Sequence, residues 1–415
     1  MTTDSAAPET VAQNDPEGEQ LYYQLMMAPP DDPFPTYHRL RRAAPALLTS
    51  DGSQLVLSRH ADCDAALRHR AFGKADEWLR LHVKDIPEDE LRPVMERMQR
   101  SMILTNPPDH TRLRRVIGSA FSARHILALR PNIERWVDEV LDAMADDPGG
   151  DFMSTAAMPL PVNVIADLLG VPESDRQDIA PAIHDMGLLI EPAAGPEEIV
   201  QGARAENALA DYFKGLLDHK RVHPGDDLLT RLIDSQSGEV LDETETLATA
   251  ILMFAGGNKP TANMLGNGLD AMFRTPGALD RIREDRSLIP SAVEEMLRID
   301  APAHVDVASV LEPVTFLGAD LVPGQTLIVL LGSANRDPEV FGDPDTFDVG
   351  RSVNPHLSFA AGLHYCLGGP LAKLEGQIFL NRLLDRFSGY SVGDGKRSPG
   401  LGHHGFESLP FTLLG

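Results

Sequence analysis

Residues 359–368 read Phe-Ala-Ala-Gly-Leu-His-Tyr-Cys-Leu-Gly, and this stretch is the most informative part of the chain. It places Cys366, one of two cysteines, in a short glycine-bearing loop directly before residues 369–375, which have the composition of a helix start. Unpaired backbone N–H groups and the positive end of the helix dipole both favour thiolate over thiol at such a position. A thiolate held in this way is a soft, electron-rich metal ligand.

Haem iron is one metal that accepts a single cysteine thiolate, and the rest of the loop suits a flat cofactor. Gly362 and Gly368 let the backbone come close to a ring where a Cβ atom would collide. Phe359 can pack near the ring, and His364 can reach a haem propionate. The other cysteine, Cys63, is expected to be a small buried hydrophobic residue.

The composition predicts one large domain behind a short tail. The chain has 415 residues, of which 42% are hydrophobic, and it has no internal linker rich in Gly, Ser or Pro. Residues 1–20 combine acidic and small polar residues and are expected to form a disordered acidic tail. Residues 21–415 are expected to form a single domain.

Charge and apolar patterning exclude several partners. The net charge of −25 disfavours nucleic acid and anionic membrane surfaces. No apolar run approaches the roughly 20 residues that span a bilayer, and the N-terminus has neither a basic start nor an apolar stretch. Two cysteines, one of them assigned to a metal, do not make a disulfide framework. We therefore expect a soluble cytoplasmic protein with no membrane and no nucleic-acid partner.

Hydrophobic periodicity predicts a mainly α-helical protein with small β-sheets. From about residue 61 to residue 300 most apolar residues recur at helical spacing. Residues 46–57 read as a β-hairpin that turns at Asp51-Gly52, and strand-like runs return at 315–317 and 326–331.

A second chemical motif lies at the start of a predicted helix after Pro107-Pro108. His110 and Arg114 are four residues apart and therefore share one helix face. An imidazole and a guanidinium on one face form a suitable clamp for a carboxylate such as a haem propionate.

The loop pattern Phe-x-x-Gly-x-His-x-Cys-x-Gly resembles the haem-thiolate loop of the cytochrome P450 family, and the resemblance extends over roughly residues 30–415. It implies the cytochrome P450 fold, haem b as cofactor, Cys366 as the axial metal ligand, and an oxidoreductase activity. Ala360 stands where the family usually has glycine.

The resemblance also assigns roles on the helix that follows Pro108. His110 and Arg114 are similar to the family's propionate-binding pair. Arg112 and Arg115 lie on a different part of this helix, which in the family borders the proximal face. They are therefore candidates for docking an acidic ferredoxin-type electron donor.

Glu295 and Arg298 resemble a buried pair that the family uses as a structural lock behind the haem. The arginine that often completes this lock would fall at Thr346 and is absent. We therefore expect an incomplete network, or one that is rebuilt through Arg336.

A further departure concerns the second propionate. Members of the family usually carry a propionate-binding arginine where Ala308 stands. His304 and His356 are the nearest replacement candidates by sequence, although His304 and Asp306 could instead face the substrate.

The oxygen-activation helix, residues 249–268, is the least typical segment. Aligning its glycines and asparagine with the family puts Lys259 at the usual acid and Pro260 at the usual threonine of the proton relay. Pro260 has no N–H group, which leaves the Gly256 carbonyl without its helical donor. Thr261 or Asn258 could replace the relay, or the substrate could supply a hydroxyl.

Lys259-Pro260 also resembles the arginine-proline pair of the family's peroxide-using branch, in which the cation holds a substrate carboxylate. The simpler alternative is that Lys259 points along the helix surface and that Pro260 only kinks the helix.

The leading hypothesis is a bacterial-type haem-thiolate monooxygenase. It would oxidise, by default hydroxylate, a small-to-medium organic substrate in secondary metabolism with dioxygen and electrons from ferredoxin. A peroxide-driven peroxygenase, an atypical coupling or rearrangement enzyme, and a non-catalytic haem- or ligand-binding module are the alternatives. The expected substrate pocket is lined by the mostly apolar residues near 90–105, 181–196, 253–261, 303–307 and 406–410.

Overall fold

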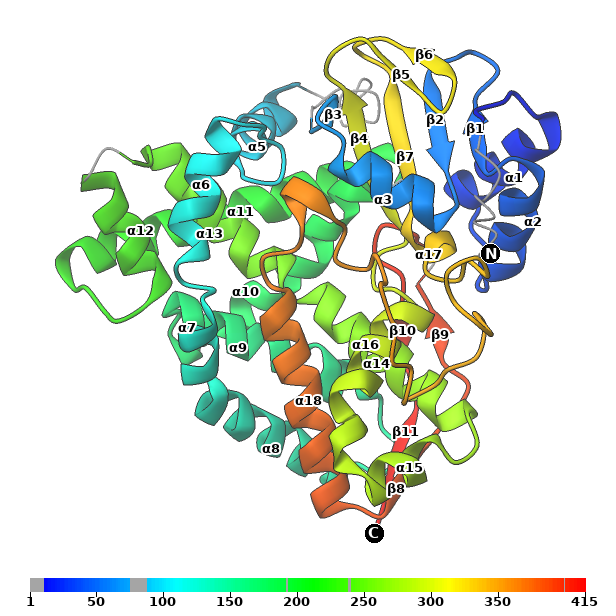
Figure 1. The fold of residues 1–415 in the computed structure, drawn as a ribbon. Helices are drawn as coiled ribbons and strands as arrows, with labels where there is room; N and C mark the ends of the chain where they lie inside the picture. Colours follow the sequence, from blue (N-terminus) through cyan, green and yellow to red (C-terminus); the bar gives the residue numbers. More distant parts are fainter. Residues whose placement is uncertain (1–10, 75–87, 192, 238–239, 399) are drawn as a thin grey trace.

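Helices form most of the computed structural model, and a sheet region lies at one side of them (Figure 1). The structure describes residues 11–74, 88–191, 193–237, 240–398 and 400–415. In chain order up to the long α11, the helical segments are α1 (Pro16–Met27), α2 (Phe34–Ala43), α3 (His60–Arg68), α5 (Glu88–Arg100), α6 (Asp109–Gly118), α7 (Ala123–Ala128), α8 (Arg130–Asp146), η1 (Met153–Ala157), α9 (Pro159–Leu169), α10 (Glu173–Met186), η2 (Gly187–Ile190) and α11 (Pro196–Val222). After it come α12 (Leu228–Ser237), α13 (Glu243–Gly256), α14 (Lys259–Arg274), α15 (Ala278–Glu284), η3 (Arg286–Leu288), α16 (Ile289–Ile299), α17 (Leu331–Ala334), η4 (Gly362–His364) and α18 (Gly369–Arg386).

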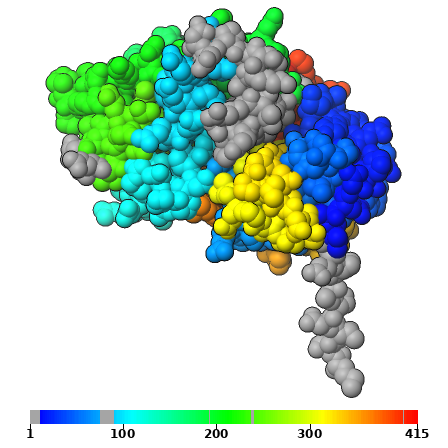
Figure 2. Space-filling model, turned by 90° about the horizontal axis from the view of Figure 1, so that it is seen from above, coloured from blue at the N-terminus to red at the C-terminus, as the bar shows by residue number. Residues whose placement is uncertain are grey.

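Four sheets are small, as the sequence predicts. The strands are β1 (Ala46–Leu48), β2 (Gln54–Leu57), β3 (Phe72–Gly73), β4 (Val305–Val310), β5 (Val314–Phe316), β6 (Ala319–Leu321), β7 (Thr326–Leu330), β8 (Gly389–Val392), β9 (Lys396–Arg397), β10 (Phe406–Ser408) and β11 (Phe411–Leu414). The largest sheet has five strands in the order β1-β2-β7-β4-β3. From above, the yellow strands of the β4–β6 region lie between the blue N-terminal region and cyan α5 and α6 (Figure 2).

The predicted hairpin is confirmed. Strand β1 pairs antiparallel with β2 in a register that sets Ala46 opposite Leu57. The turn contains Gly52 at a φ of 69°, a left-handed conformation that glycine adopts without strain. The Asp51 carboxylate accepts a hydrogen bond from the Ser53 amide at 2.9 Å and closes the turn.

The predicted tail is too long. Residues 1–10 lie outside the described part, but α1 already begins at Pro16. The Asp15 carboxylate accepts a hydrogen bond from the Gly18 amide at 2.6 Å, which caps the first turn. Asp15, Glu17 and Glu19, which suggested a tail, are therefore the cap and first turn of a helix, where negative charge is favourable.

The helical core positions α14 against α16 and α18. Met264 and Leu265 of α14, Met296 of α16 and Phe379 of α18 are fully buried in one cluster. Gly268 permits the close crossing, because a Cβ atom there would lie 2.3 Å from the Met296 side chain. This contact fixes α14 relative to the helix that carries the Glu295–Arg298 pair.

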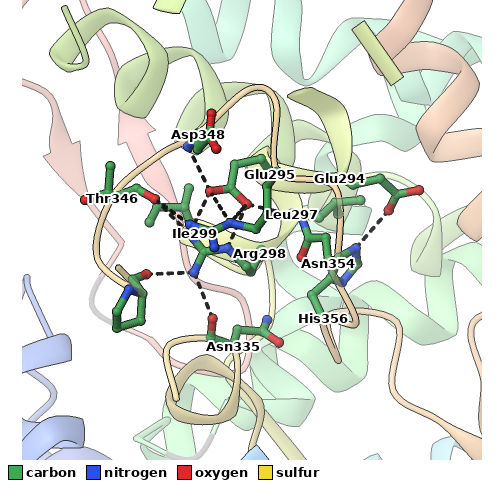
Figure 3. A network of polar contacts seen from close by, with 12 residues as sticks. Glu294, Glu295, Leu297, Arg298, Ile299, Asn335, Thr346, Asp348, Asn354 and His356 are labelled. Atoms are coloured by element: carbon green, nitrogen blue, oxygen red, sulfur yellow. Dashed lines mark hydrogen bonds and ion pairs between the residues drawn. The ribbon is translucent and has the colours of Figure 1, made fainter. Parts of the chain in front are cut away.

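The Glu295–Arg298 pair is completely buried and organises the chain that leads to Cys366 (Figure 3). The two side chains form paired hydrogen bonds of 2.7 Å each. The remaining Arg298 donors bind the carbonyls of Asn335, Pro344 and Thr346 at 2.7–3.0 Å. One buried guanidinium thus holds three separate points of the irregular segment after α17.

The expectation for the third member of this network needs correction. Arg351, and not Arg336, contacts Glu295, with its Nε atom 3.1 and 3.0 Å from the two carboxylate oxygens. Arg336 instead donates to the Ile299 carbonyl and pairs with Asp345. The network is complete, although its third arginine follows Thr346 by five positions.

Within the described ranges, no single helix is long and apolar enough to cross a membrane. One sharply bent pair, Met153–Leu169 with Glu173–Ile190, meets the length and composition test together, at a bend of 120°. Its apolar residues, including Leu160, Ile165 and Ile183, belong to the main helical core.

Replacing Glu295 by glutamine should lower the free energy of unfolding by about 3–5 kcal/mol, because it leaves the Arg298 charge buried without its anion. Urea denaturation of the haem-loaded protein measures the loss. Glu294→Gln is the matched control, since the Glu294 side chain is one-third exposed and its partners are His356 and Lys373. An equal and small effect of both substitutions would contradict this role of the pair.

Candidate active site

Cys366 lies at the wall of a cavity of about 350 Å³, here called the main cavity. The loop is shaped by a hydrogen bond of 2.9 Å from the Cys366 amide to the Phe359 carbonyl. Ala360 has a φ of 54°, a conformation that costs a residue with a Cβ atom about 1 kcal/mol, which explains the family's preference for glycine. Phe359 and Gly368 also line the cavity, as predicted.

The protonation of Cys366 is governed by two opposing effects. Burial raises the pKa of the thiol, and it outweighs the hydrogen bonds from the Gly368 and Gly369 amides at the start of α18, which lower it. The amides favour the thiolate as the sequence suggests, but they are not sufficient alone. A bound metal ion deprotonates a coordinating thiol outright, so metal binding decides the charge of this sulfur.

His110 and His364 provide unsatisfied donors to the main cavity. Both ring nitrogens of His110 and the Nε2 atom of His364 are buried without a hydrogen-bond partner. The two ring centroids are 4.4 Å apart. Burial lowers the pKa of His364 to about 3, with further lowering by Lys74 and His110, so its ring is neutral. Buried polar atoms of this kind require an acceptor that enters the cavity.

Arg114 lines the same cavity and donates to the Tyr365 carbonyl at 2.7 Å, which leaves further N–H groups for another acceptor. His110 and Arg114 share one face of α6, as their spacing predicts.

Lys74 is a cavity residue that the sequence analysis missed. It follows β3, which pairs antiparallel with β4 so that Gly73 lies opposite Ser309. Continuing this register puts Lys74 opposite Ala308, where the family usually has its second propionate-binding arginine. The Lys74 ammonium contacts the Asp306 carboxylate and the Val307 carbonyl and faces the main cavity. Only the register of two strands distant in sequence reveals this relation.

Three predicted cofactor contacts are not supported by the structure. His304 is fully buried between Tyr37 and Asp300, at 3.2 and 3.3 Å, and does not line the main cavity. His356 bonds to Glu294 at 2.9 Å and also lies outside it. Gly362 packs against α3, since a Cβ atom there would lie 2.4 Å from a backbone oxygen of that helix.

The helix above the cavity is broken beside the predicted relay. Helix α13 ends at Gly256 and α14 begins at Lys259, as expected for a proline that leaves a carbonyl without its donor. Pro260 and Thr261 line the main cavity. The Thr261 hydroxyl donates to the Gly257 carbonyl at 2.8 Å.

Asn258 and Lys259 take other positions. Asn258 is fully buried, and its side-chain amide donates to the Phe254 carbonyl. Lys259 lines a neighbouring cavity of about 130 Å³, here called the second cavity, and is absent from the lining of the main one. Of the four oxygen-side candidates, only Pro260 and Thr261 therefore border the main cavity.

Glu375 is a second residue that sequence reasoning missed. It lies on α18, lines the main cavity, and has one carboxyl oxygen without a partner. Burial raises its pKa to about 8, so the group is predominantly a neutral acid at pH 7. A glutamate within an otherwise ordinary helix gives no local signal of this environment.

Comparison with known proteins agrees with this site. The cytochrome P450 family profile matches residues 204–399. Cytochrome P450 107B1 from Saccharopolyspora erythraea is 37% identical to this chain, over 80% of this chain and 81% of its own length. The chain belongs to the cytochrome P450 family. The cytochrome P450 monooxygenase PikC from Streptomyces venezuelae is 36% identical, over 86% of this chain and 84% of its own.

Solved cytochrome P450 structures confirm the mainly α fold. CYP164A2 from Mycobacterium smegmatis, solved with econazole bound, aligns with a TM-score of 0.86 and 33% identity and covers 95% of this chain and 100% of that one. Members of the family bind haem b, so this chain is a haem-dependent oxidoreductase. The main cavity fits the group, since it offers one thiol for the iron and unsatisfied imidazole nitrogens, beside Arg114 and Lys74, for its carboxylates.

Removing the donors of the main cavity should loosen the cofactor. His110→Ala, Arg114→Ala and Lys74→Met should each weaken haem retention by about 1.5–3 kcal/mol, since each removes a hydrogen bond to a charged group. Transfer of haem to apo-myoglobin measures the release rate.

Arg115→Ala is the matched control, because Arg115 is exposed on the same helix and does not line the main cavity. Adding Ala308→Arg to Lys74→Met should restore retention if the two positions serve one carboxylate. Release rates in the three variants that equal the control's would show that these donors do not hold haem.

Proposed function

We propose that the protein is a monooxygenase that hydroxylates a small-to-medium organic molecule of secondary metabolism, with Cys366 as the axial ligand of haem. The main support for this proposal is that three features line one mainly apolar cavity. They are the Cys366 thiol, the unsatisfied His110–His364 pair and the broken helix. Haem bound to a cysteine thiolate supplies the activation of dioxygen that such an oxidation needs.

The cationic rim positions the cofactor. His110, Arg114 and His364 would hold one or both carboxylates, and Lys74 would act from the opposite side in place of an arginine at position 308. Asp306 orients Lys74 and balances part of its charge. Charge-assisted hydrogen bonds of this kind fix a flat ring more rigidly than apolar contacts alone.

Thr261 is the proposed proton-handling residue. Its hydroxyl proton is directed to the Gly257 carbonyl, so the oxygen lone pairs remain available to accept a hydrogen bond from water or substrate in the cavity. It lies one residue after the position at which the family's threonine was expected. Thr261 lies in the first turn of α14 and lines the main cavity, so a hydroxyl is still present at the cavity wall.

The relatives support the substrate class. One similar solved structure is the cytochrome P450 monooxygenase TamI with tirandamycin C bound, and one relative is a vitamin D(3) 25-hydroxylase from Pseudonocardia autotrophica. These names concern those proteins. For this chain they support an organic substrate that fits between α13, α14 and the β4 region.

A ferredoxin-type donor is the proposed electron source, and one of its two candidate docking residues is already engaged. Arg112 binds Glu245 at 2.7 and 2.8 Å and Asp109 at 3.0 Å, which makes it a structural residue. Arg115 is exposed on the same helix and remains the candidate for docking.

The peroxide-driven alternative loses its main argument. It required Lys259 to hold a substrate carboxylate above the haem, yet Lys259 lines the second cavity. No feature of the described residues favours coupling or rearrangement over hydroxylation. A purely non-catalytic module does not agree with relatives that are monooxygenases.

Thr261→Ala should uncouple the reaction, whereas Thr261→Ser should not, because only the first removes the hydroxyl. With ferredoxin, its reductase and a compound that shifts the Soret band, the ratio of product formed to reductant consumed should fall by about 10²-fold or more in Thr261→Ala. The missing product should appear as hydrogen peroxide.

An equal ratio of product formed to reductant consumed in Thr261→Ala and Thr261→Ser would rule out Thr261 as the proton-handling residue. A parallel reaction with hydrogen peroxide and no electron donor decides the oxidant. Fast turnover there, together with poor turnover with ferredoxin, would favour the peroxygenase over the proposed monooxygenase.

A further inference from the structure

Two neighbouring cavities lie beside the broken helix. The second cavity, of about 130 Å³, shares Ile103, Leu252 and Gly256 with the main cavity. Haem would fill part of the main cavity, and the second cavity adjoins that space at these shared residues. The second cavity is therefore the natural place for the far end of a substrate of moderate length.

Two consecutive residues after the break at residues 257–258 lie in different environments. Pro260 lines the main cavity and Lys259 lines the second one. Gly257 and Asn258 keep right-handed helical backbone angles across the break. Neighbouring helical residues point about 100° apart around the axis, so Lys259 and Pro260 can face different cavities.

The Lys259 ammonium has unused hydrogen-bonding capacity. Within the described residues it forms no hydrogen bond or ion pair, although Glu191 and Glu407 are near enough to raise its pKa against the larger lowering by burial. Glu191 is held by the Leu401 amide at 3.2 Å, and Glu407 pairs with Lys396. Both carboxylates are thus engaged by other groups.

A second unused nitrogen converges on the same point. The His403 Nδ1 atom is buried without a partner, and His403 lines the second cavity. A Cβ atom built on Gly187 would lie 3.5 Å from that nitrogen and 3.7 Å from Lys259 Nζ. Burial lowers the pKa of His403 to about 3, so the ring is neutral and Lys259 is the principal donor.

The remaining wall is apolar or already paired. Met98, Ile183, Met186 and Leu189 supply apolar surface. Glu206, at the other end, forms paired hydrogen bonds with Arg97. Among the described lining residues, Lys259 and His403 therefore present two unpaired nitrogens close together, while the Ser101 hydroxyl accepts a hydrogen bond of 3.5 Å from the Ile103 amide.

We propose that the second cavity binds the far end of an elongated, mostly apolar substrate whose terminal oxygen acceptor is hydrogen-bonded by Lys259. The acceptor is a carboxylate or a neutral carbonyl or hydroxyl oxygen. This inference rests on the proposed monooxygenase function, and it makes Lys259 a determinant of which molecules bind and which carbon faces the haem.

Titration of the haem-loaded protein tests the proposal through the Soret shift. The probes are dodecanoate, dodecan-1-ol and the oxygen-free hexylbenzene. Lys259→Met should raise the dissociation constant of at least one oxygen-ended probe by about tenfold or more, since it removes a charged donor at nearly constant volume. Hexylbenzene should bind the variant and the wild type within about twofold of each other.

Lys214→Met is the control, since Lys214 is an exposed lysine on α11, and Lys259→Arg should retain most of the affinity. If Lys259→Met weakens the binding of dodecanoate alone, the acceptor is anionic. If it weakens the binding of both oxygen-ended probes, the acceptor is neutral. Unchanged affinities in Lys259→Met, or no Soret shift by either oxygen-ended probe in the wild type, would overturn the proposal. Neither result would affect the haem-thiolate spectrum, which tests the proposed function separately.

Discussion

A buried ion pair between Glu295 and Arg298 anchors the irregular chain that leads to Cys366. Neither side chain has any exposed surface, so the pair persists only because every remaining donor and acceptor is used. The remaining N–H groups of Arg298 donate to carbonyls of the irregular segment after α17. Arg351, from the same segment, donates to Glu295. The segment that presents Cys366 is thereby fixed without regular secondary structure.

The broken helix is the second determinant, and it couples catalysis to recognition. Pro260 cannot donate to the Gly256 carbonyl, and the helix restarts instead of continuing. After the break, Thr261 lines the main cavity and Lys259 lines the second one. The same short segment therefore carries both the proposed proton-handling hydroxyl and the proposed substrate-binding cation.

Sequence reasoning succeeded where function depends on short spacing and failed where it depends on long-range packing. The Cys366 loop and the His110–Arg114 face were predictable, because a loop before a helix and a four-residue spacing fix the geometry locally. Lys74 could not be found, since it meets position 308 only through strand pairing. Arg351 lies in an irregular loop whose path no pattern encodes. Acidic residues near Pro16 suggested disorder but cap a helix.

Ligation of the haem iron by the Cys366 sulfur can be tested with the spectrum of the reduced carbon monoxide complex. The wild-type protein should absorb near the wavelength that gives the family its name, and Cys366→Ser should lose or shift that band while Cys63→Ser keeps it. Cys63 is the internal control, because it is fully buried in the separate core beside the large sheet. An unchanged band in Cys366→Ser would contradict the assignment of the ligand.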